Sequence, residues 1–195
     1  MTTNVATRNQ LYEVRWHGRG GQGAVTSAEL VAQAAIIEEK YGQAFPSFGP
    51  ERRGAPVVAF VRVNHDQPIR IRAEITRPDA VVVLDPGLLQ VVNVAQGLKS
   101  DGIVIVNTKK TADQIRTEFK IKHALAVVNA TKIAKEVLGV NIVNTTMVGA
   151  LLKATGVVKI ESLTEPLKAR FGKLADRNFA SMKTAYEQTV VKEKE

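Results

Sequence analysis

The sequence predicts an α/β fold, namely a Rossmann-like, doubly wound and mostly parallel sheet with an antiparallel β-hairpin insertion. Short runs such as 80–84 and 102–106 are apolar at nearly every position, as in strands that are buried on both faces. Segments with helical apolar spacing alternate with these runs, which favours strand–helix–strand units. The 195 residues suit a flexible segment at 1–10 followed by a single domain over 11–195.

In the first part of the chain, residues 11–17 alternate as a strand would and stop at a glycine. Residues 25–40 have apolar side chains at helical spacing and predict a helix. The segment 41–56 is rich in glycine and proline, so we expect no single regular element there.

The hairpin is expected where residues 57–63 and 69–74 flank the turn-forming stretch 64–68. Further strands are expected at 80–84, 102–106 and 124–128, and helices at 88–98, 111–120, 131–138, 145–155 and over most of 163–191.

The chain contains no cysteine, which excludes disulfides, a cysteine nucleophile and cysteine ligands for an iron–sulfur cluster. His17, His65 and His123 lie far apart and lack metal-ligand spacing. We therefore assign no metal site and no catalytic residue to this chain. Any electron carrier that it serves is expected on another chain.

The net charge of +8 raises the question of nucleic-acid binding. The excess of lysine and arginine is spread along the chain, and aromatic residues make up only 5%. We expect acidic partners or anionic ligands instead of nucleic acid. No apolar run is long enough to span a bilayer, and the polar start lacks a signal-peptide core, so we expect a cytoplasmic protein without membrane contact.

Residues 18–23, GRGGQG, fit the G-x-G-x-x-G pattern between an expected strand and an expected helix. Glycines let backbone N–H groups converge on an anion, and Arg19 adds a forked donor. A dinucleotide site also needs an acidic residue about 20 positions later, but Glu38 and Glu39 fall at the end of a helix. Three interpretations stay open: a nicotinamide or flavin site, a tight turn without a ligand, or a loop that serves a site shared with other chains.

A second motif lies at 45–56, where Glu51, Arg52 and Arg53 are flanked by glycine and proline. Two adjacent guanidinium groups suit phosphate or carboxylate recognition. A solvated loop, or a salt bridge at a subunit interface, fits the composition equally well.

Three other positions have local interpretations, and two of them have an alternative. Asp85 follows an expected strand at the edge where α/β folds bind ligands, although turn formation at Asp-Pro-Gly is the preferred explanation. Asn144 begins an Asn-Thr-Thr stretch that is expected to cap the following helix. Trp16 suits either the core or an interface.

Taken in order, these motifs give a specific resemblance. GRGGQG at 18–23, followed about 25 residues later by FGPERRG at 48–54, resembles the gamma subunit of pyruvate:ferredoxin oxidoreductases, in the 2-oxoacid:ferredoxin oxidoreductase family. The likeness continues through RPD at 77–79, LDP at 84–86 and NTTMVGA at 144–150, and thus covers about residues 11–155. The FGPERRG form is closer to the pyruvate or branched-chain enzymes than to the 2-oxoglutarate branch.

The resemblance implies a subunit of an enzyme that converts pyruvate, coenzyme A (CoA) and oxidised ferredoxin to acetyl-CoA, carbon dioxide and reduced ferredoxin, reversibly. It implies alpha, beta and delta partner subunits, which carry thiamine diphosphate with Mg²⁺ and [4Fe-4S] clusters, and ferredoxin as a further partner. The sequence agrees, because it lacks both cysteine and the Gly-Asp-Gly motif typical of thiamine diphosphate sites.

On this interpretation the chain binds no cofactor alone and contributes to assembly and to the CoA side of the active site. The expected binding residues are Arg19, Gly20, Gly21, Gln22, Gly23, Glu51, Arg52 and Arg53. The rival functions are the gamma subunit of a 2-oxoisovalerate or other 2-oxoacid enzyme, and a free-standing oxidoreductase that binds NAD or flavin.

Overall fold

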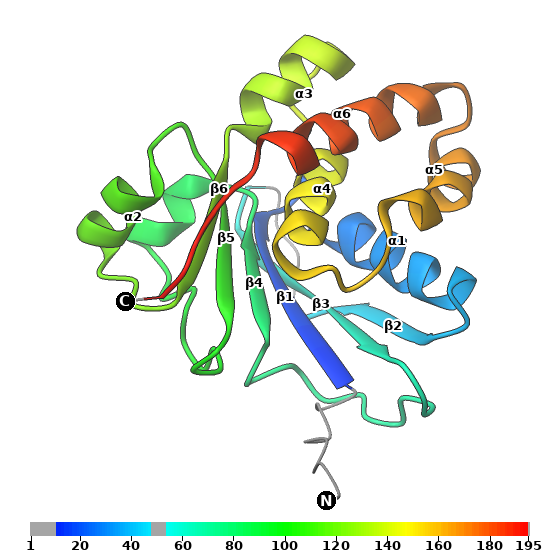
Figure 1. Cartoon of the computed structure of the whole chain (residues 1–195), viewed down its shortest axis with the longest axis horizontal. Helices are drawn as coiled ribbons and strands as arrows, with labels where there is room; N and C mark the ends of the chain where they lie inside the picture. The colour runs from blue at the N-terminus through cyan, green and yellow to red at the C-terminus, as the bar shows by residue number, and fades with distance from the viewer. Residues whose placement is uncertain (1–10, 48–53, 195) are drawn as a thin grey trace, which may run out of the picture.

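A computed structural model of the chain describes residues 11–47 and 54–194. The segment 1–10 and the predicted binding residues Glu51, Arg52 and Arg53 lie outside the described residues. A seven-stranded sheet runs through the molecule in the order β2-β3-β1-β4-β5-β6-β7. Helices lie against both of its faces (Figure 1), so the predicted α/β class is confirmed.

The strands are β1 (Leu11–Arg19), β2 (Tyr41–Pro46), β3 (Pro56–Asn64), β4 (Ala80–Val83), β5 (Ile103–Asn107), β6 (Ala124–Val128) and β7 (Val190–Lys192). The helices are α1 (Ala24–Ile37), α2 (Ala112–Phe119), α3 (Ala130–Leu138), α4 (Asn144–Thr155), α5 (Thr164–Phe171) and α6 (Ala175–Gln188). Short 3-10 turns cover Pro86–Gln90, Ile160–Leu163 and Gly172–Leu174. Within the described ranges, no helix combines the length and the apolar character needed to cross a membrane.

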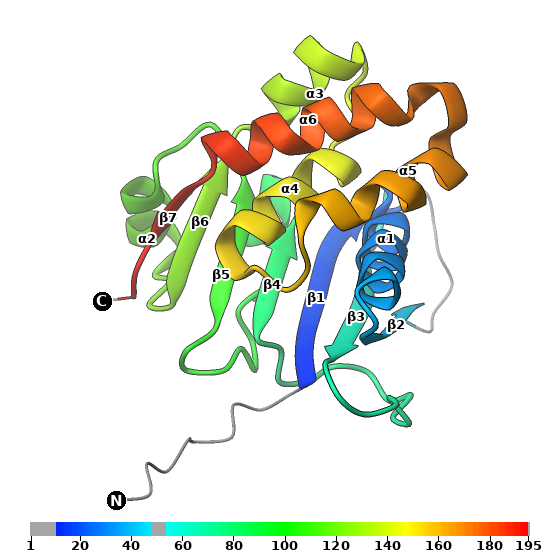
Figure 2. The ribbon, with the colours of Figure 1, turned by 45° about the vertical axis from the view of Figure 1, so that its right-hand side comes forward.

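Strands β1, β4, β5 and β6 are parallel neighbours and form the predicted parallel sheet. All four side chains of β4 are buried, because alternate residues point to opposite faces and both faces are covered. Val82 belongs to the core that includes α1, α4 and α6, whereas Val81 and Val83 belong to the core that includes α2. Figure 2 shows α1, α4, α5 and α6 together over one face.

The chain reverses its direction of winding at β1. After α1 it forms β2 and β3 on one side of β1, and it then returns to build β4, β5 and β6 on the other side. This reversal is the topological switch point at which open α/β sheets bind ligands, just beyond the carboxyl ends of the strands. The glycine motif at the end of β1 therefore occupies the switch point.

The predicted hairpin partner of β3 is wrong. Residues 69–74 form no strand, and β3 pairs antiparallel with β1 and with β2, which lies inside the stretch expected to be irregular. The Asn64 side chain accepts hydrogen bonds from the N–H groups of Asp66 and Gln67, which turns the chain out of the sheet. Gly42 permits β2 to form, because a Cβ there would lie 2.3 Å from the Ala32 carbonyl oxygen of α1.

Segment 65–79 instead runs on the face of β1 and β3 opposite α1, and two arginines hold it there. Arg62, only 2% exposed, donates to the carbonyl oxygens of Ile71 and Ala73 at 3.1 and 2.7 Å. Arg62 also pairs with Glu13 at 2.8 Å. Arg15 donates to the carbonyl oxygens of Val94 and Gln96, and so extends the same role to the next loop. Polar contacts with the backbone thus replace a covering helix.

Two other predictions needed correction. The helix expected at 88–98 is only the short turn Pro86–Gln90, followed by turns in which Gly97 adopts φ +73°. Its β-branched valines disfavour a helix, which explains the early end. The last residues of the segment expected to be mostly helical form β7, which pairs antiparallel with β6.

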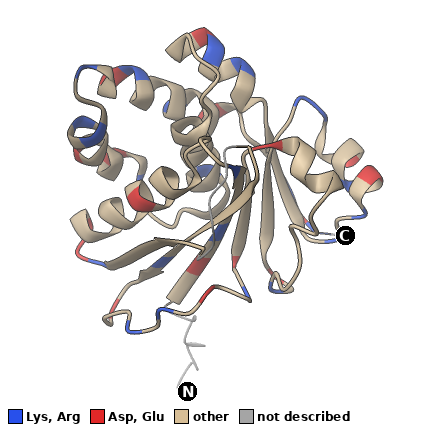
Figure 3. Ribbon diagram, turned by 180° about the vertical axis from the view of Figure 1, so that it is seen from behind, with Lys and Arg blue, Asp and Glu red and all other residues tan. Residues whose placement is uncertain are grey.

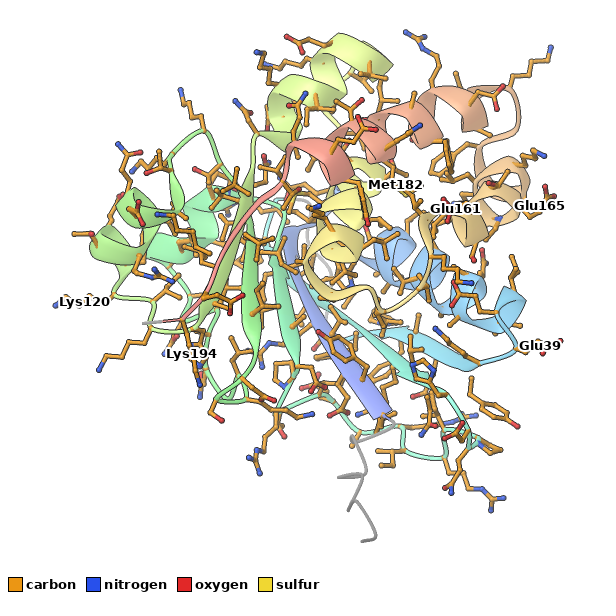
Figure 4. All side chains as sticks on the ribbon, viewed as in Figure 1. Glu39, Lys120, Glu161, Glu165, Met182 and Lys194 are labelled. Atoms are coloured by element: carbon orange, nitrogen blue, oxygen red, sulfur yellow. The ribbon has the colours of Figure 1, made fainter. Side chains whose placement is uncertain are left out.

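The helices over the main core approach closely through one glycine. A Cβ on Gly149 of α4 would lie 2.0 Å from the Met182 carbonyl oxygen of α6. Met182, labelled in Figure 4, lies where the two helices meet and is fully buried. Next to this contact, Thr146 and Ser181 hydroxyls hydrogen bond at 2.7 Å. The small side chain at 149 thus sets the separation of α4 and α6.

We expect Gly149→Ala to lower the free energy of unfolding of the chain by about 3 kcal/mol, because the added methyl group forces the helices apart. Urea denaturation followed by circular dichroism measures this loss. Lys183→Ala, at an exposed position beside Met182, serves as the control and should stay within about 0.5 kcal/mol of the parent. A Gly149→Ala chain of parental stability would contradict the close contact.

Candidate functional site

The glycine motif forms a turn between the end of β1 and the start of α1. Gly21 and Gly23 adopt φ +90° and +80°, a region that disfavours other residues. The Gln22 N–H donates to the Arg19 carbonyl oxygen at 2.9 Å, and the Arg19 N–H donates to Gln22 Oε1 at 2.8 Å. A Cβ on Gly21 would meet none of the described residues within 4 Å, so these residues leave this side of the turn open.

Asp85 holds the turn to the neighbouring strand end. Its Oδ2 accepts from Arg19 Nε at 2.7 Å and from Gln22 Nε2 at 3.4 Å, and its Oδ1 accepts from the Gly87 N–H at 2.8 Å. Asp85 thus has the expected turn role and also pairs with the first motif. Arg19 donates from Nη1 to the Gly54 carbonyl oxygen at 3.2 Å, so its fork is oriented before any ligand binds.

The two sequence motifs meet at this turn as far as the described residues reach. The Gly20 N–H donates to the Ala55 carbonyl oxygen at 3.0 Å, and the Gly54 N–H donates to the Gly20 carbonyl oxygen at 3.4 Å. The residue range that ends the second motif therefore lies against the first. The roles of Glu51, Arg52 and Arg53 stay predictions, because these residues are outside the described part.

Helix α1 begins at this turn with Gly23 as its N-cap and no side-chain cap. The first N–H groups of an α-helix have no partner within the helix, and they carry the positive end of its dipole. A helix start of this kind, next to an open glycine turn, is suited to an anion.

Asn144 places a polar side chain beside the start of α1. The expected capping role is wrong: α4 begins at Asn144, its N-cap is Val143, and no side chain caps it. The residue is 6% exposed, and its side-chain amide makes no hydrogen bond within the described residues, although its polar atoms are not fully enclosed. A Cβ on Gly23 would lie 2.7 Å from Asn144 Nδ2, so this unpaired amide lies against the start of α1.

A cavity of about 230 Å³ opens beside the turn. Its lining includes Gly21, Gln22, Asp85, Asn107 and Thr131. Asn107, at the end of β5, donates to the Leu84 carbonyl oxygen and to Thr131 Oγ1, each at 2.9 Å. We did not predict this asparagine from the sequence, although a polar residue that closes a buried apolar run marks the ligand-binding edge of such a sheet.

The dinucleotide interpretation lacks its acidic residue. Glu38 lies at the opposite end of the 14-residue α1, about 20 Å from the turn by helix rise. It accepts from the Lys159 N–H and from Ser162, and it pairs with Lys40 at 2.7 Å. Burial alone would raise its pKa, but these partners lower the pKa below its ordinary value. Glu38 thus anchors the end of α1 and does not face the turn.

Two neighbours of the turn in β1 have structural roles. Trp16 is fully buried, which decides for the core over an interface. His17 is 6% exposed, and its Nε2 accepts from Arg15 Nε at 3.1 Å. Burial, reinforced by the nearby Arg15 charge, lowers the pKa of His17 to about 3, so the ring is neutral. Within the described ranges, no group of three or more His, Asp or Glu side chains could hold a metal ion.

Comparison with known proteins places this geometry in a family. The model of the pyruvate ferredoxin/flavodoxin oxidoreductase family matches residues 13–188. The chain belongs to this family. Over 185 residues it is 56% identical to the pyruvate/ketoisovalerate oxidoreductases common subunit gamma of Thermococcus litoralis, with 94% of this chain and 100% of that protein covered. It is therefore a gamma-type subunit, as the motifs predicted.

Solved structures agree with this assignment. The pyruvate oxidoreductase subunit PORC from Thermotoga maritima superposes with a TM-score of 0.85 at 36% identity, covering 94% of this chain and 99% of that one. The 2-oxoglutarate:ferredoxin oxidoreductase from Magnetococcus marinus shares the fold with a TM-score of 0.69 at 18% identity, over 92% of this chain and 30% of that one. The gamma-type fold thus also occurs within a longer chain.

The pH dependence of stability tests the buried state of His17. The folded state keeps the ring neutral, whereas the unfolded chain binds a proton below the ordinary pKa of 6.5, so stability is present above that pH and is lost below it. We expect the parent to lose roughly 2 kcal/mol between pH 7 and pH 5 through this residue. In urea denaturation, the His17→Gln chain should lose less stability than the parent between pH 7 and pH 5, by the amount that His17 contributes.

His65→Gln, at an exposed position, is the matched control and should keep the parental pH dependence. Equal pH profiles for the parent and His17→Gln would show that His17 binds its proton equally well in the folded and unfolded chain, and would contradict the buried neutral ring.

Proposed function

We propose that this gamma-type subunit supplies the CoA side of a shared active site in a cytoplasmic 2-oxoacid:ferredoxin oxidoreductase. The observation that carries the proposal is the Asn144 amide, which makes no hydrogen bond within the described residues and lies beside the glycine turn and the uncapped start of α1. Side-chain and backbone donors thus converge at the topological switch point, where an anionic ligand is expected.

CoA has the chemistry that such a site recognises. Its diphosphate suits the Gly21 and Gly23 N–H groups, which make no hydrogen bond within the described residues, and the positive end of α1. The Asn144 amide would gain the hydrogen bond that it lacks in the chain alone. Arg19 lies on the rim, already oriented by Asp85, and Arg52 and Arg53 stay proposed contacts on the second motif.

The redox chemistry is proposed to take place on partner chains. Alpha, beta and delta subunits would hold thiamine diphosphate with Mg²⁺ and the [4Fe-4S] clusters. Those groups would supply the release of carbon dioxide from pyruvate, the transfer of the acetyl group to the CoA sulfur with loss of the thiol proton, and the passage of the two electrons, one at a time, to ferredoxin. The absence of cysteine from this chain supports that division. The role of our chain is to bind and orient CoA.

The Magnetococcus marinus enzyme was solved with 2-oxoglutarate, CoA and succinyl-CoA bound. CoA as the acyl acceptor is therefore compatible with an enzyme that contains this fold. The Thermococcus litoralis relative is named a subunit common to pyruvate and ketoisovalerate oxidoreductases. That name favours a second candidate, in which our chain also serves a 2-oxoisovalerate enzyme and the partner chains select the oxoacid.

Asn144→Ala in the assembled complex tests the proposal. Loss of one hydrogen bond to a charged group costs about 1.5–3 kcal/mol, so we expect the KM for CoA to rise by roughly 10- to 100-fold. The KM for pyruvate should stay within about twofold, because that pocket lies on other chains. Steady-state reduction of ferredoxin at varied CoA and at varied pyruvate separates the two constants.

Asn93→Ala is the matched control, because Asn93 is exposed and lies outside the cavity beside the turn. It should change neither constant. A folded Asn144→Ala complex with the parental KM for CoA would contradict a CoA site at the turn.

A further inference from the structure

A second cavity adjoins the candidate site at the ends of β5 and β6. It has a volume of about 750 Å³, and four lysines line it: Lys109, Lys110, Lys132 and Lys135. We call it the lysine groove. Figure 3 shows lysine and arginine, in blue, on α3 and on the loop that joins β5 to α2.

The positive charge of the groove is poorly compensated. Among the described residues that line it, Glu136 is the one carboxylate, and its pair with Lys132, 3.8 Å long and exposed on both sides, contributes little. Lys110 pairs with Glu118 on α2. Lys109 and Lys135 make no ion pair or hydrogen bond within residues 11–47 and 54–194.

One of the two lysines on α3 is unfavourably placed in the chain alone. Asn129 is the N-cap of α3, so Lys132 lies in the first turn, where the helix dipole disfavours a positive charge. Lys135 lies in the last turn, where the dipole favours its charge, but it follows Lys132 by three residues on the same side of the helix, where like charges repel. A bound anion would relieve this repulsion and the unfavourable charge of Lys132.

The lysine groove adjoins the cavity beside the glycine turn. Pro86, Asn107 and Thr131 line both cavities and form a shared wall between the turn and the lysines. A ligand that meets the donors on both sides of this wall would carry two anionic groups joined by a neutral unit. In CoA, the 5′-diphosphate and the 3′-phosphate are separated in this way by one ribose.

We propose that the lysine groove binds the 3′-phosphate of CoA and makes the subunit selective for CoA over 3′-dephospho-CoA. This inference rests on the proposed function, and it adds the part of the ligand that the groove recognises. Lys109, Lys132 and Lys135 contact the phosphate, while Asn107 and Thr131 face the ribose from the shared wall. The lysines bind the acceptor and take no part in the chemical step.

The test compares CoA with 3′-dephospho-CoA as acceptors for the assembled complex. The parent should have a KM for CoA roughly tenfold or more below that for 3′-dephospho-CoA, equivalent to one charge-assisted contact. The double variant Lys132→Gln/Lys135→Gln should raise the KM for CoA about tenfold and leave that for 3′-dephospho-CoA within twofold. Its kcat should be unchanged, and high salt should reduce the preference of the parent.

Lys173→Gln/Lys183→Gln removes the same charge from exposed positions near α6 and should preserve the preference. An unchanged KM ratio in Lys132→Gln/Lys135→Gln would overturn the inference. So would weakened subunit assembly on size-exclusion chromatography with the KM ratio preserved in the complex that remains, because the groove would then hold an acidic segment of a partner. If the lysine variant fails in this way but Asn144→Ala still raises the KM for CoA, the proposed function survives without the lysine groove. If neither Asn144→Ala nor Lys132→Gln/Lys135→Gln changes the KM for CoA, the proposed function and this inference both fail.

Discussion

The carboxylate of Asp85 is the constraint on which the arrangement of the site depends. It joins the end of β4 to the glycine turn after β1 through Arg19, and it also closes its own turn through the Gly87 N–H. One side chain thereby fixes two strand ends on either side of the switch point. Because Arg19 is paired, the donors of the turn that make no hydrogen bond within the described residues are the Gly21 and Gly23 N–H groups and the neighbouring Asn144 amide, and a ligand would meet these without displacing the carboxylate.

The rest of the fold supports this edge by unequal means on its two faces. On the face covered by α1, α4 and α6 the packing is apolar and close. Gly42 and Gly149 permit backbone contacts there that any residue with a Cβ would prevent. On the opposite face of β1, the buried Arg62 and the half-buried Arg15 hold irregular segments by their carbonyl oxygens. Such contacts satisfy buried polar groups without a regular element, and they leave the loops around the site defined in position.

Much of this was predictable where the pattern was local. Short runs of β-branched residues predicted the parallel strands, and the position of the glycines between a strand and a helix predicted the glycine turn. The hairpin at 64–68 was misassigned because the turn residues are real but the chain after them leaves the sheet, through the Asn64 side chain. Asn144 was misassigned for the same kind of reason, since its type suits a cap and only its neighbours show that it caps nothing.

The sequence by itself determined the family, the alternation of strands and helices, and the absence of cysteine ligands, because each is encoded in neighbouring residues or in composition. The tertiary structure alone decided that β3 lies between β1 and β2, and that Gly23 and Asn144, far apart in the sequence, meet at one helix start. It also decided that the lysine groove adjoins the turn. Register and long-range contacts depend on how whole elements pack, and no local pattern of side chains specifies them.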